Sequence, residues 1–310
     1  MLCHVRSFAY DGTGTGPMLS LTETSRPARA FLTLIGVPLK RVHIFEFEDA
    51  PWFPSFLRRS ITDLIVVTNR MFGVTTAIEG LVRRVHQETP LRRIVDLGSG
   101  AGGAMPEVVQ RLREQDGLAI DLCLTDLFPN SEAVSRWGGG TVSGVHYVPH
   151  PVDATRCSEV PADLYTIVNS FHHMTPENAR KMLQSAAESH TPLLVVEMAD
   201  NRLPFAVWLT FLPLGILVNV VMALLFTLQI RPISWTRLLL TYGLRVIPIL
   251  FAWDGQASYP RIYGFDDLDQ LLSGLTSDEY AWEKGYAKTP SGKGMTIYLY
   301  GYPNHENARV

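Results

Sequence analysis

A short glycine-rich segment has the clearest chemical signature in the sequence. Gly98, Gly100 and Gly102 stand at alternate positions after a buried-strand candidate that ends near Asp96, and a helical pattern over 104–114 follows at once. Glycines let the backbone turn sharply and approach a ligand closely, because no Cβ intervenes. The N-terminus of the following helix adds free N–H groups and a partial positive charge. The segment therefore predicts a site for a nucleotide-like cofactor, the alternative being a glycine-rich turn without a ligand.

Two cofactors are compatible with these glycines. Gly98, Gly100 and Gly103 fit the dinucleotide spacing G-x-G-x-x-G. Asp96 precedes them, however, and a carboxylate next to an anionic pyrophosphate is unfavourable. The frame D-x-G-x-G-x-G, from Asp96 to Gly102, resembles motif I of class I S-adenosylmethionine-dependent methyltransferases. The resemblance implies S-adenosyl-L-methionine (SAM), whose cationic sulfonium and ammonium groups Asp96 would help to hold, directly or through water.

Strands alternate with helices around this segment. Apolar strand candidates cover 118–125, 145–148, 164–169 and 193–197, and helix candidates cover 131–136 and 176–189. Such alternation predicts an α/β fold with a doubly wound parallel sheet. Right-handed crossovers place the carboxyl ends of all these strands at one edge of the sheet, where ligands bind.

The C-terminal pattern favours the methyltransferase over the dinucleotide fold. A helix candidate at 265–275 precedes two strand candidates, 279–288 and 295–302, joined by turn residues at 289–294. They predict a long closing β-hairpin. The resemblance implies an antiparallel last strand of this kind, which a NAD-binding Rossmann domain typically lacks.

The resemblance also assigns cofactor contacts to the carboxyl ends of the strands. Asp126 ends the second strand, where an acid would bind the ribose hydroxyls. Asp153 follows the third strand, near the adenine amino group. Asp126 and Asp153 could each instead cap a helix or turn. The complete predicted cofactor set is Asp96, Gly98, Ser99, Gly100, Gly102, Asp126, Leu127, Asp153, Ala154 and Asn169.

Two adjacent histidines follow the fourth strand, beside the expected methyl group. A hydroxyl acceptor needs a base, and histidine titrates near neutral pH, so His172 and His173 are the catalytic candidates. The alternative is that one of them only packs or bonds locally. The carboxylates form no convincing ligand set, and we predict no metal.

Six further residues are candidates for contacts with the acceptor. They lie in a predicted helical cap, after the fifth strand, and in the segment W-D-G-x-x-S-x-x-R-x-Y, where Asp254-Gly255 predicts a tight turn. That segment resembles a connector of some bacterial small-molecule methyltransferases. Structural anchoring is the alternative for the cap and connector residues. The six are Trp52, Phe53, Glu197, Asp200, Tyr259 and Arg261.

An apolar insertion separates the fifth strand from the C-terminal elements. Residues 203–230 contain no charge, and this exceeds the roughly 18–20 apolar residues of a candidate membrane span. A single span would put the closing hairpin and the rest of the sheet on opposite sides of a membrane. We therefore expect a helical hairpin, its first helix interrupted near Pro213, Gly215 and Asn219. It would form a lid on the core, a dimer face or a monotopic membrane contact, and its apolar wall argues for a hydrophobic acceptor.

Composition bounds the remaining possibilities. The 310 residues carry a net charge of −3 without a basic stripe, which argues against nucleic acid as a partner. Cys3, Cys123 and Cys157 lack metal or disulfide spacing, and residues 1–25 lack a secretory pattern. We expect a cytoplasmic protein, either free or peripheral to the membrane.

The sequence thus predicts five segments and one function. The segments are a poorly structured N-terminus (1–40), a helical cap (41–89), a SAM-binding α/β core (90–202), the apolar insertion (203–253), and a last helix with the closing hairpin (254–310). The function is SAM-dependent methyl transfer to a hydrophobic small molecule. The alternatives are a NAD(P)-dependent oxidoreductase and a non-catalytic SAM-binding scaffold.

Overall fold

The centre of the molecule is one mixed β-sheet. The computed structural model describes residues 6–7, 39–138, 144–289 and 296–304. The sheet order is β1-β7-β8-β6-β5-β2-β3-β4, and β8 is the strand that runs antiparallel to its neighbours. The strands are β1 (Arg6–Ser7), β2 (Arg93–Asp96), β3 (Asp121–Leu124), β4 (Val145–Tyr147), β5 (Leu164–Val168), β6 (Leu193–Glu197), β7 (Tyr280–Tyr286) and β8 (Ile297–Pro303).

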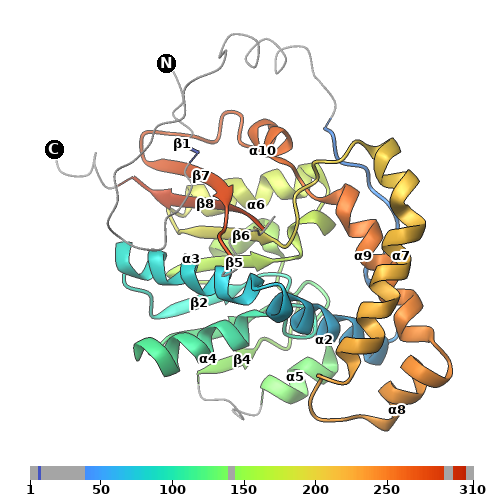
Figure 1. Ribbon diagram of the computed structural model, residues 1–310. Helices are drawn as coiled ribbons and strands as arrows, with labels where there is room; N and C mark the ends of the chain where they lie inside the picture. Colours follow the sequence, from blue (N-terminus) through green and yellow to red (C-terminus); the bar gives the residue numbers. More distant parts are fainter. Residues whose placement is uncertain (1–5, 8–38, 139–143, 290–295, 305–310) are drawn as a thin grey trace.

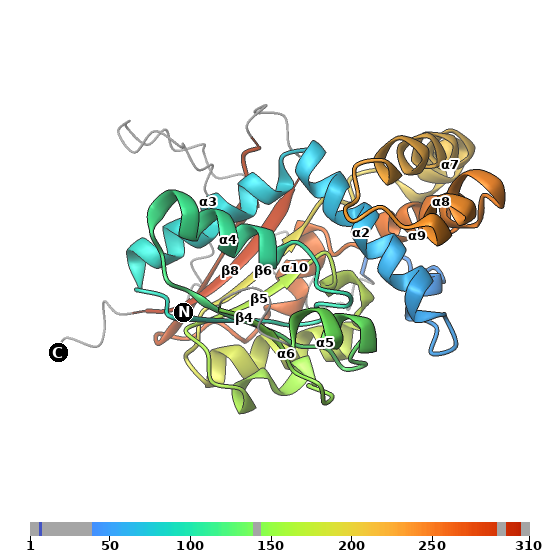
Figure 2. The same cartoon turned by 90° about the horizontal axis from the view of Figure 1, so that it is seen from below.

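Helices cover both faces of this sheet, as Figure 2 shows. Successive residues of a strand point to opposite faces. Ile94 packs in a core with α3 (Val74–Glu88) and α4 (Met105–Asp116), whereas Val95 packs in a second core with α6 (Pro176–Glu188) and α10 (Phe265–Leu271). Both side chains are completely buried, which is why the strands read as continuous apolar runs. The predicted doubly wound sheet with a C-terminal antiparallel hairpin is confirmed.

The order of the strands reverses at β2. The chain passes from β2 to β3 and β4 on one side, then returns to β5 on the other side of β2. The crossover helices therefore diverge at the carboxyl ends of β2 and β5 and leave a crevice between the loops, which is the usual binding position in an open α/β sheet. The glycine segment lies at this point.

Two helices precede β2, close to the predicted ranges. The 3₁₀ turn η1 (Phe47–Asp49) leads into α2 (Ser55–Met71), and α3 follows after a bend of 77°. Gly73 stands at the bend with φ +74°, a conformation that residues with a Cβ rarely adopt. Most of the predicted N-terminal segment 1–40, and most of the hairpin turn 289–294, lie outside the described residues.

The apolar insertion forms helices beside α2, away from the sheet (Figure 1). They are α7 (Phe205–Thr227), the single turn α8 (Trp235–Leu238), the π-helix η4 (Leu239–Gly243) and α9 (Val246–Arg261). By length and composition, α7 could cross a membrane. Buried residues of α7 and α9, such as Phe226 and Phe251, pack against Leu57, Ile61 and Leu64 of α2. We call residues 203–253 the apolar lobe.

Two expectations about this region are wrong. Helix α7 continues through Pro213 and Gly215, and the predicted Asp254-Gly255 turn lies inside α9. The glycines serve close packing of α7 on α9 instead of turning the chain. A Cβ on Gly215 would meet the Gln256 side chain at 2.3 Å, and one on Gly255 would meet Asn219 at 2.8 Å. Glycine in a helix therefore marks helix contact here.

Candidate cofactor and acceptor cleft

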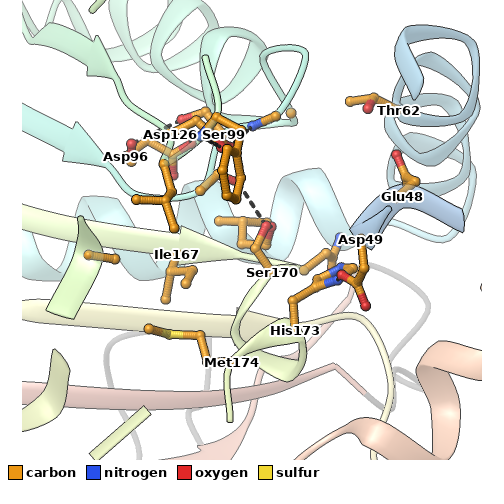
Figure 3. Close-up of a pocket in the computed structure, with 18 of the residues that line it drawn as sticks. Glu48, Asp49, Thr62, Asp96, Ser99, Asp126, Ile167, Ser170, His173 and Met174 are labelled. Carbon is orange, nitrogen blue, oxygen red and sulfur yellow. Dashed lines mark hydrogen bonds and ion pairs between the residues drawn. The ribbon is translucent and has the colours of Figure 1, made fainter. Parts of the chain in front are cut away.

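A cleft of about 460 Å³ opens at the point where the strand order reverses. One wall comes from η1 and α2, and the other from the loops after β2, β3, β4 and β5 (Figure 3). Of the predicted cofactor residues, nine line it: Asp96, Gly98, Ser99, Gly100, Asp126, Leu127, Asp153, Ala154 and Asn169. Segments that are far apart in the sequence therefore share one cavity.

The glycine turn brings backbone to the cleft with little side chain. Gly98 and Gly100 have φ +65° and +55°, which residues with a Cβ adopt at a cost. A Cβ on Gly100 would find no closer described neighbour than the Thr62 hydroxyl across the cleft, at 4.0 Å, so the cavity begins at this backbone. Gly102 differs, because a Cβ there would lie 2.7 Å from Nε1 of Trp137. Gly102 permits packing behind the turn and is not one of the residues that line the cleft.

The Asp96 carboxylate stabilises this glycine turn through hydrogen bonds. Its carboxylate accepts hydrogen bonds from the Ser99 hydroxyl at 2.6 Å and the Thr166 hydroxyl at 2.7 Å. Burial raises the pKa of Asp96 to about 7, although these two hydrogen bonds favour the charged form. Asp96 thus fixes the position of the turn and adds a carboxyl group to the floor of the cleft.

Asp126, just after β3, connects that strand to the glycine turn. One carboxylate oxygen accepts the Gly100 N–H at 2.8 Å, and the other accepts the Phe128 N–H at 2.8 Å. Burial raises the pKa of Asp126. Each oxygen keeps a second lone pair, so the group remains able to accept two ligand hydroxyls. Leu127 follows it on the rim and is 47% exposed.

The next two predicted contacts are held by local bonds. Asp153 caps the 3₁₀ helix η2 (Ala154–Glu159) by accepting the Thr155 N–H at 2.9 Å, and it lines the cleft as well. Asn169 has φ +52°, and its amide bonds Asn69 and the Met198 backbone. A non-glycine residue held in the left-handed region of φ is strained. At Asp153, the capping bond and a position facing the cleft occur together, so the two roles are compatible.

His173 lies on the acceptor side of the cleft. Its Nδ1 is 2.6 Å from Asp49, and its Nε2 is 3.6 Å from Glu46. Burial alone would lower the His173 pKa, but the charge of Glu46 and the bond to Asp49 raise it to about 9. His173 is therefore a cation at neutral pH.

His172 lies behind His173. The ring centroids are 4.3 Å apart. The Glu197 carboxylate accepts the His172 backbone N–H at 3.0 Å and lies 2.9 Å from Nδ1. The other ring nitrogen, Nε2, is buried 3.9 Å from Glu46 and has no hydrogen-bond partner among the described residues. The cleft lining includes His173 but not His172 or Glu197.

Helix α9 holds the acidic turn η1 in place. Arg261 is completely buried, and its guanidinium lies 3.0 Å from Glu46 and 2.7 Å from Asp49. Asp254 accepts the Phe47 and Glu48 N–H groups, and burial raises its pKa to about 7. Arg261 thus orients Asp49, which in turn orients His173.

The remaining acceptor candidates lie outside the cleft lining. Trp52 is 69% exposed, and Phe53 is buried in the core of α2, α7 and α9. Asp200 is buried, and its carboxylate accepts hydrogen bonds from the exposed Arg202 and from the Tyr286 hydroxyl. The Tyr259 hydroxyl accepts the Arg202 backbone N–H at 3.2 Å. These contacts are structural anchors, which was the alternative stated for Phe53, Tyr259 and Arg261.

Sequence reasoning missed most of the acceptor wall. The acidic run before Pro51 was visible, but nothing in its spacing indicated that it reaches the strands. Glu48 is the notable case, because burial raises its pKa to about 8, with a further contribution from the charge of Asp254. The lining residues that were missed include Glu48, Asp49, Arg58, Thr62, Asn69, Phe128, Asn130, Ser170, Met174 and Asn178.

Three residues beside the cleft have donor atoms close enough together to hold a metal ion. Donor atoms of Glu46, His172 and His173 lie within 4.8 Å of one another. The Arg261 guanidinium already contacts Glu46, one of the three residues, and it would repel a metal cation bound there. The arrangement favours a buried network of ion pairs.

Comparison with known proteins gives remote similarities. No protein-family model matches the chain. Among curated proteins, the non-reducing polyketide synthase ausA of Penicillium brasilianum is 24% identical over 127 residues, which are 40% of this chain and 5% of the synthase. Activities of the complete synthase are therefore not transferable to this chain.

Several solved structures that resemble this chain are methyltransferases. The mitomycin 7-O-methyltransferase MmcR is 15% identical, with 76% of this chain and 56% of that chain covered, at a TM-score of 0.41. The plantazolicin methyltransferase BamL, crystallised with a substrate analogue and SAH, is 12% identical over 81% of this chain and 98% of that chain, at 0.47. Human N-acetylserotonin methyltransferase, crystallised with SAM, is 13% identical, and the match covers 88% of this chain and 61% of that chain at a TM-score of 0.46. This chain thus spans just over half the length of MmcR.

The fold is the α/β fold of class I methyltransferases. The parallel strands β2 to β6 and the reversed strand β8, inserted between β6 and β7, give the arrangement that the glycine motif implied. A dinucleotide-binding Rossmann sheet continues with parallel strands instead.

Proposed function

We propose that this protein is a SAM-dependent methyltransferase acting on a hydrophobic small molecule. The observation that carries the proposal is the charge of the cleft. Five carboxyl groups line it, against the cations Arg58 and His173; the five are Glu48, Asp49, Asp96, Asp126 and Asp153. Burial leaves Glu48 largely neutral and Asp96 about half charged at pH 7, so the lining keeps a smaller negative excess over the two cations. A pyrophosphate would still be repelled there, whereas a sulfonium and an ammonium group would be attracted.

Each cofactor residue then has a role that its geometry supports. The Gly98–Gly100 backbone leaves room for the amino-acid portion of the ligand, above the Asp96 carboxyl. Asp126 would accept the two ribose hydroxyls, and Asp153 with Ala154 would meet the adenine. When bound, SAM supplies an electrophilic methyl group, so the protein has mainly to position the acceptor and exclude water.

The acceptor side combines apolar surface with two titratable groups. Pro51, Ile65 and Met174 line it, which supports an apolar acceptor. His173 and Glu48 lie on the same side, and either could take a proton from an acceptor hydroxyl once it has lost its own. Because their pKa values are about 9 and 8, base-dependent transfer would rise with pH up to that range. A rate that does not vary between pH 6 and 9 would indicate a carbon or amine acceptor that needs only orientation.

Thermal-shift titration followed by a transfer assay tests the proposal. SAM and S-adenosylhomocysteine should each stabilise the protein, and NAD should not. Methyl-tritiated SAM should then label an organic-solvent extract, and Asp126→Ala should remove both effects. The matched control is Asp121→Ala, which removes an exposed carboxylate at the opposite end of the same strand. A shift with NAD alone would replace the proposal with an oxidoreductase, and SAM binding without any transfer would leave a scaffold.

A further inference from the structure

The outward side of α7 presents an apolar stripe to its surroundings. Seven side chains spaced three or four residues apart are each at least 38% exposed: Val207, Phe211, Leu214, Val218, Val221, Leu225 and Leu228. Only 11% of the most apolar 18-residue window of α7 is buried. A helix that is apolar on all sides is normally enclosed by protein or by lipid. This stripe therefore requires a covering that residues 39–138, 144–289 and 296–304 do not supply.

The segment after α7 extends the apolar surface. Ile233, Trp235, Leu239 and Leu244 are each at least 58% exposed, and Trp235 reaches 82%. They lie on α8, η4 and the turns around them, and Figure 1 shows this segment at the outer end of the lobe. Contiguous apolar surface of this kind marks an interaction site, whereas scattered exposed residues do not.

The charges of the lobe are all of one sign. Residues 203–253 contain three arginines and no lysine, aspartate or glutamate, although the whole chain has a net charge of −3. Arg237 is paired with Asp63 of α2. Arg231 and Arg245 are exposed at the two ends of the segment that joins α7 to α9. The surface is thus apolar with a cationic border.

This pattern fits lipid better than a second copy of the chain. A helix seam that pairs with another helix is commonly flanked by charged residues that fix its register. The flanks of the α7 stripe carry no charge from 203 to 230. Two copies would also bring their arginines toward each other without acids to meet them.

The lobe is also tied to the rest of the protein in a way that opposes a membrane crossing. Strand β6 precedes α7, and β7 and β8 follow it in the same sheet. Helix α9 is fixed to η1 by Asp254 and Arg261, and Arg237 fixes α8 to α2. Helix α7 can therefore lie along a membrane surface, but the chain cannot continue to the far side.

We propose that the apolar lobe docks on an anionic lipid bilayer. Helix α7 lies in the plane of the headgroups with its stripe toward the acyl chains, and Trp235 sits at the interface. Arg231 and Arg245 meet lipid phosphates. The other side of the lobe packs on α2, whose Ile65 lines the cleft. Resting on the proposed function, this docking makes a membrane-dissolved molecule the acceptor class.

Vesicle flotation of the full chain tests the docking. The probes are phosphatidylcholine vesicles with and without 30% phosphatidylglycerol. The double variant V218E/L225E places two carboxylates in the exposed stripe, and Met71→Glu places one at the equally exposed far end of α2. We expect the protein to float with anionic vesicles, the double variant to lose binding at least tenfold, and Met71→Glu to bind like the unmodified protein. Arg231→Gln with Arg245→Gln should weaken binding and its dependence on salt.

Two results would overturn the docking proposal. One is the absence of flotation with either vesicle. The other is a dimer in solution that V218E/L225E converts to monomer, which would assign the stripe to a second copy. Calorimetry with S-adenosylhomocysteine keeps the two proposals separate, because the double variant should bind it within twofold of the unmodified protein. If the unmodified protein floats with vesicles but does not bind S-adenosylhomocysteine, the proposed function is wrong and the docking proposal stands.

Discussion

The cleft and the apolar lobe differ in which kinds of side chain they bury and which they expose to water. At the cleft, the chain buries charged groups and gives most of them partners, as with Asp96, which accepts two hydroxyls, and Arg261, which meets two acids. At the lobe, the chain leaves large apolar side chains in contact with solvent. Buried polar networks are costly unless satisfied, and exposed apolar surface is costly unless covered. Among the described residues, most charged groups of the first region have partners, whereas the apolar side chains of the second region call for an external one.

The largest effect should come from breaking the buried network of the cleft. Arg261→Met leaves Glu46 and Asp49 without their shared cation, and the free energy of unfolding should fall by about 3–5 kcal/mol. Urea titration measures it. Arg156→Met is the matched control, because it removes an exposed arginine paired with Glu159, and it should change stability by less than about 0.5 kcal/mol. Equal effects of the two variants would mean that the network does not stabilise the cleft.

A pH series sharpens the same comparison at His173. Its folded pKa of about 9 exceeds the ordinary value of 6.5, so its stabilising contribution is complete below pH 6.5 and is lost as pH rises through 9. His173→Gln should therefore destabilise the protein by about 3 kcal/mol at pH 6 and by almost nothing at pH 9.5. A difference that does not change with pH would show that His173 contributes only packing.

The glycine turn should affect binding more than stability. Gly100→Val puts a side chain into the cleft, and S-adenosylhomocysteine should bind at least ~100-fold more weakly by calorimetry. Gly117→Val is the control, since Gly117 has a similar φ of +69° and its added Cβ would have no described atom within 4 Å. It imposes the same backbone strain at the end of α4, where it should lower stability and leave affinity unchanged. Weaker binding in both variants would make the effect one of folding.

The smallest change in the free energy of unfolding should come from substituting an exposed side chain of the apolar lobe. Leu225 is 61% exposed, so Leu225→Gln should change the free energy of unfolding by less than about 0.5 kcal/mol. Leu112→Ala, in the completely buried core of α4, should cost about 2–5 kcal/mol. Comparable losses by chemical denaturation would show that α7 is covered by protein in solution.

Local patterns were sufficient to predict strands β2 to β8 and the glycine turn, but not β1, which lies in the segment expected to be poorly structured. Buried parallel strands read as apolar runs, and the turn reads from glycine spacing next to Asp96. The acceptor wall was not predictable in this way, because Asp49 meets His173 across 124 residues of sequence and only packing brings them together. Asp254-Gly255 was misread as a turn, since a glycine that permits two helices to touch has the same local signature as one that turns the chain.

A crystal structure with S-adenosylhomocysteine is the most direct test of the central claim. The account predicts the ligand in the cleft, with its ribose hydroxyls within hydrogen-bond distance of Asp126 and its amino-acid portion over Gly98 and Gly100. A cleft that stays empty at saturating ligand, or that binds a dinucleotide in its place, would contradict it.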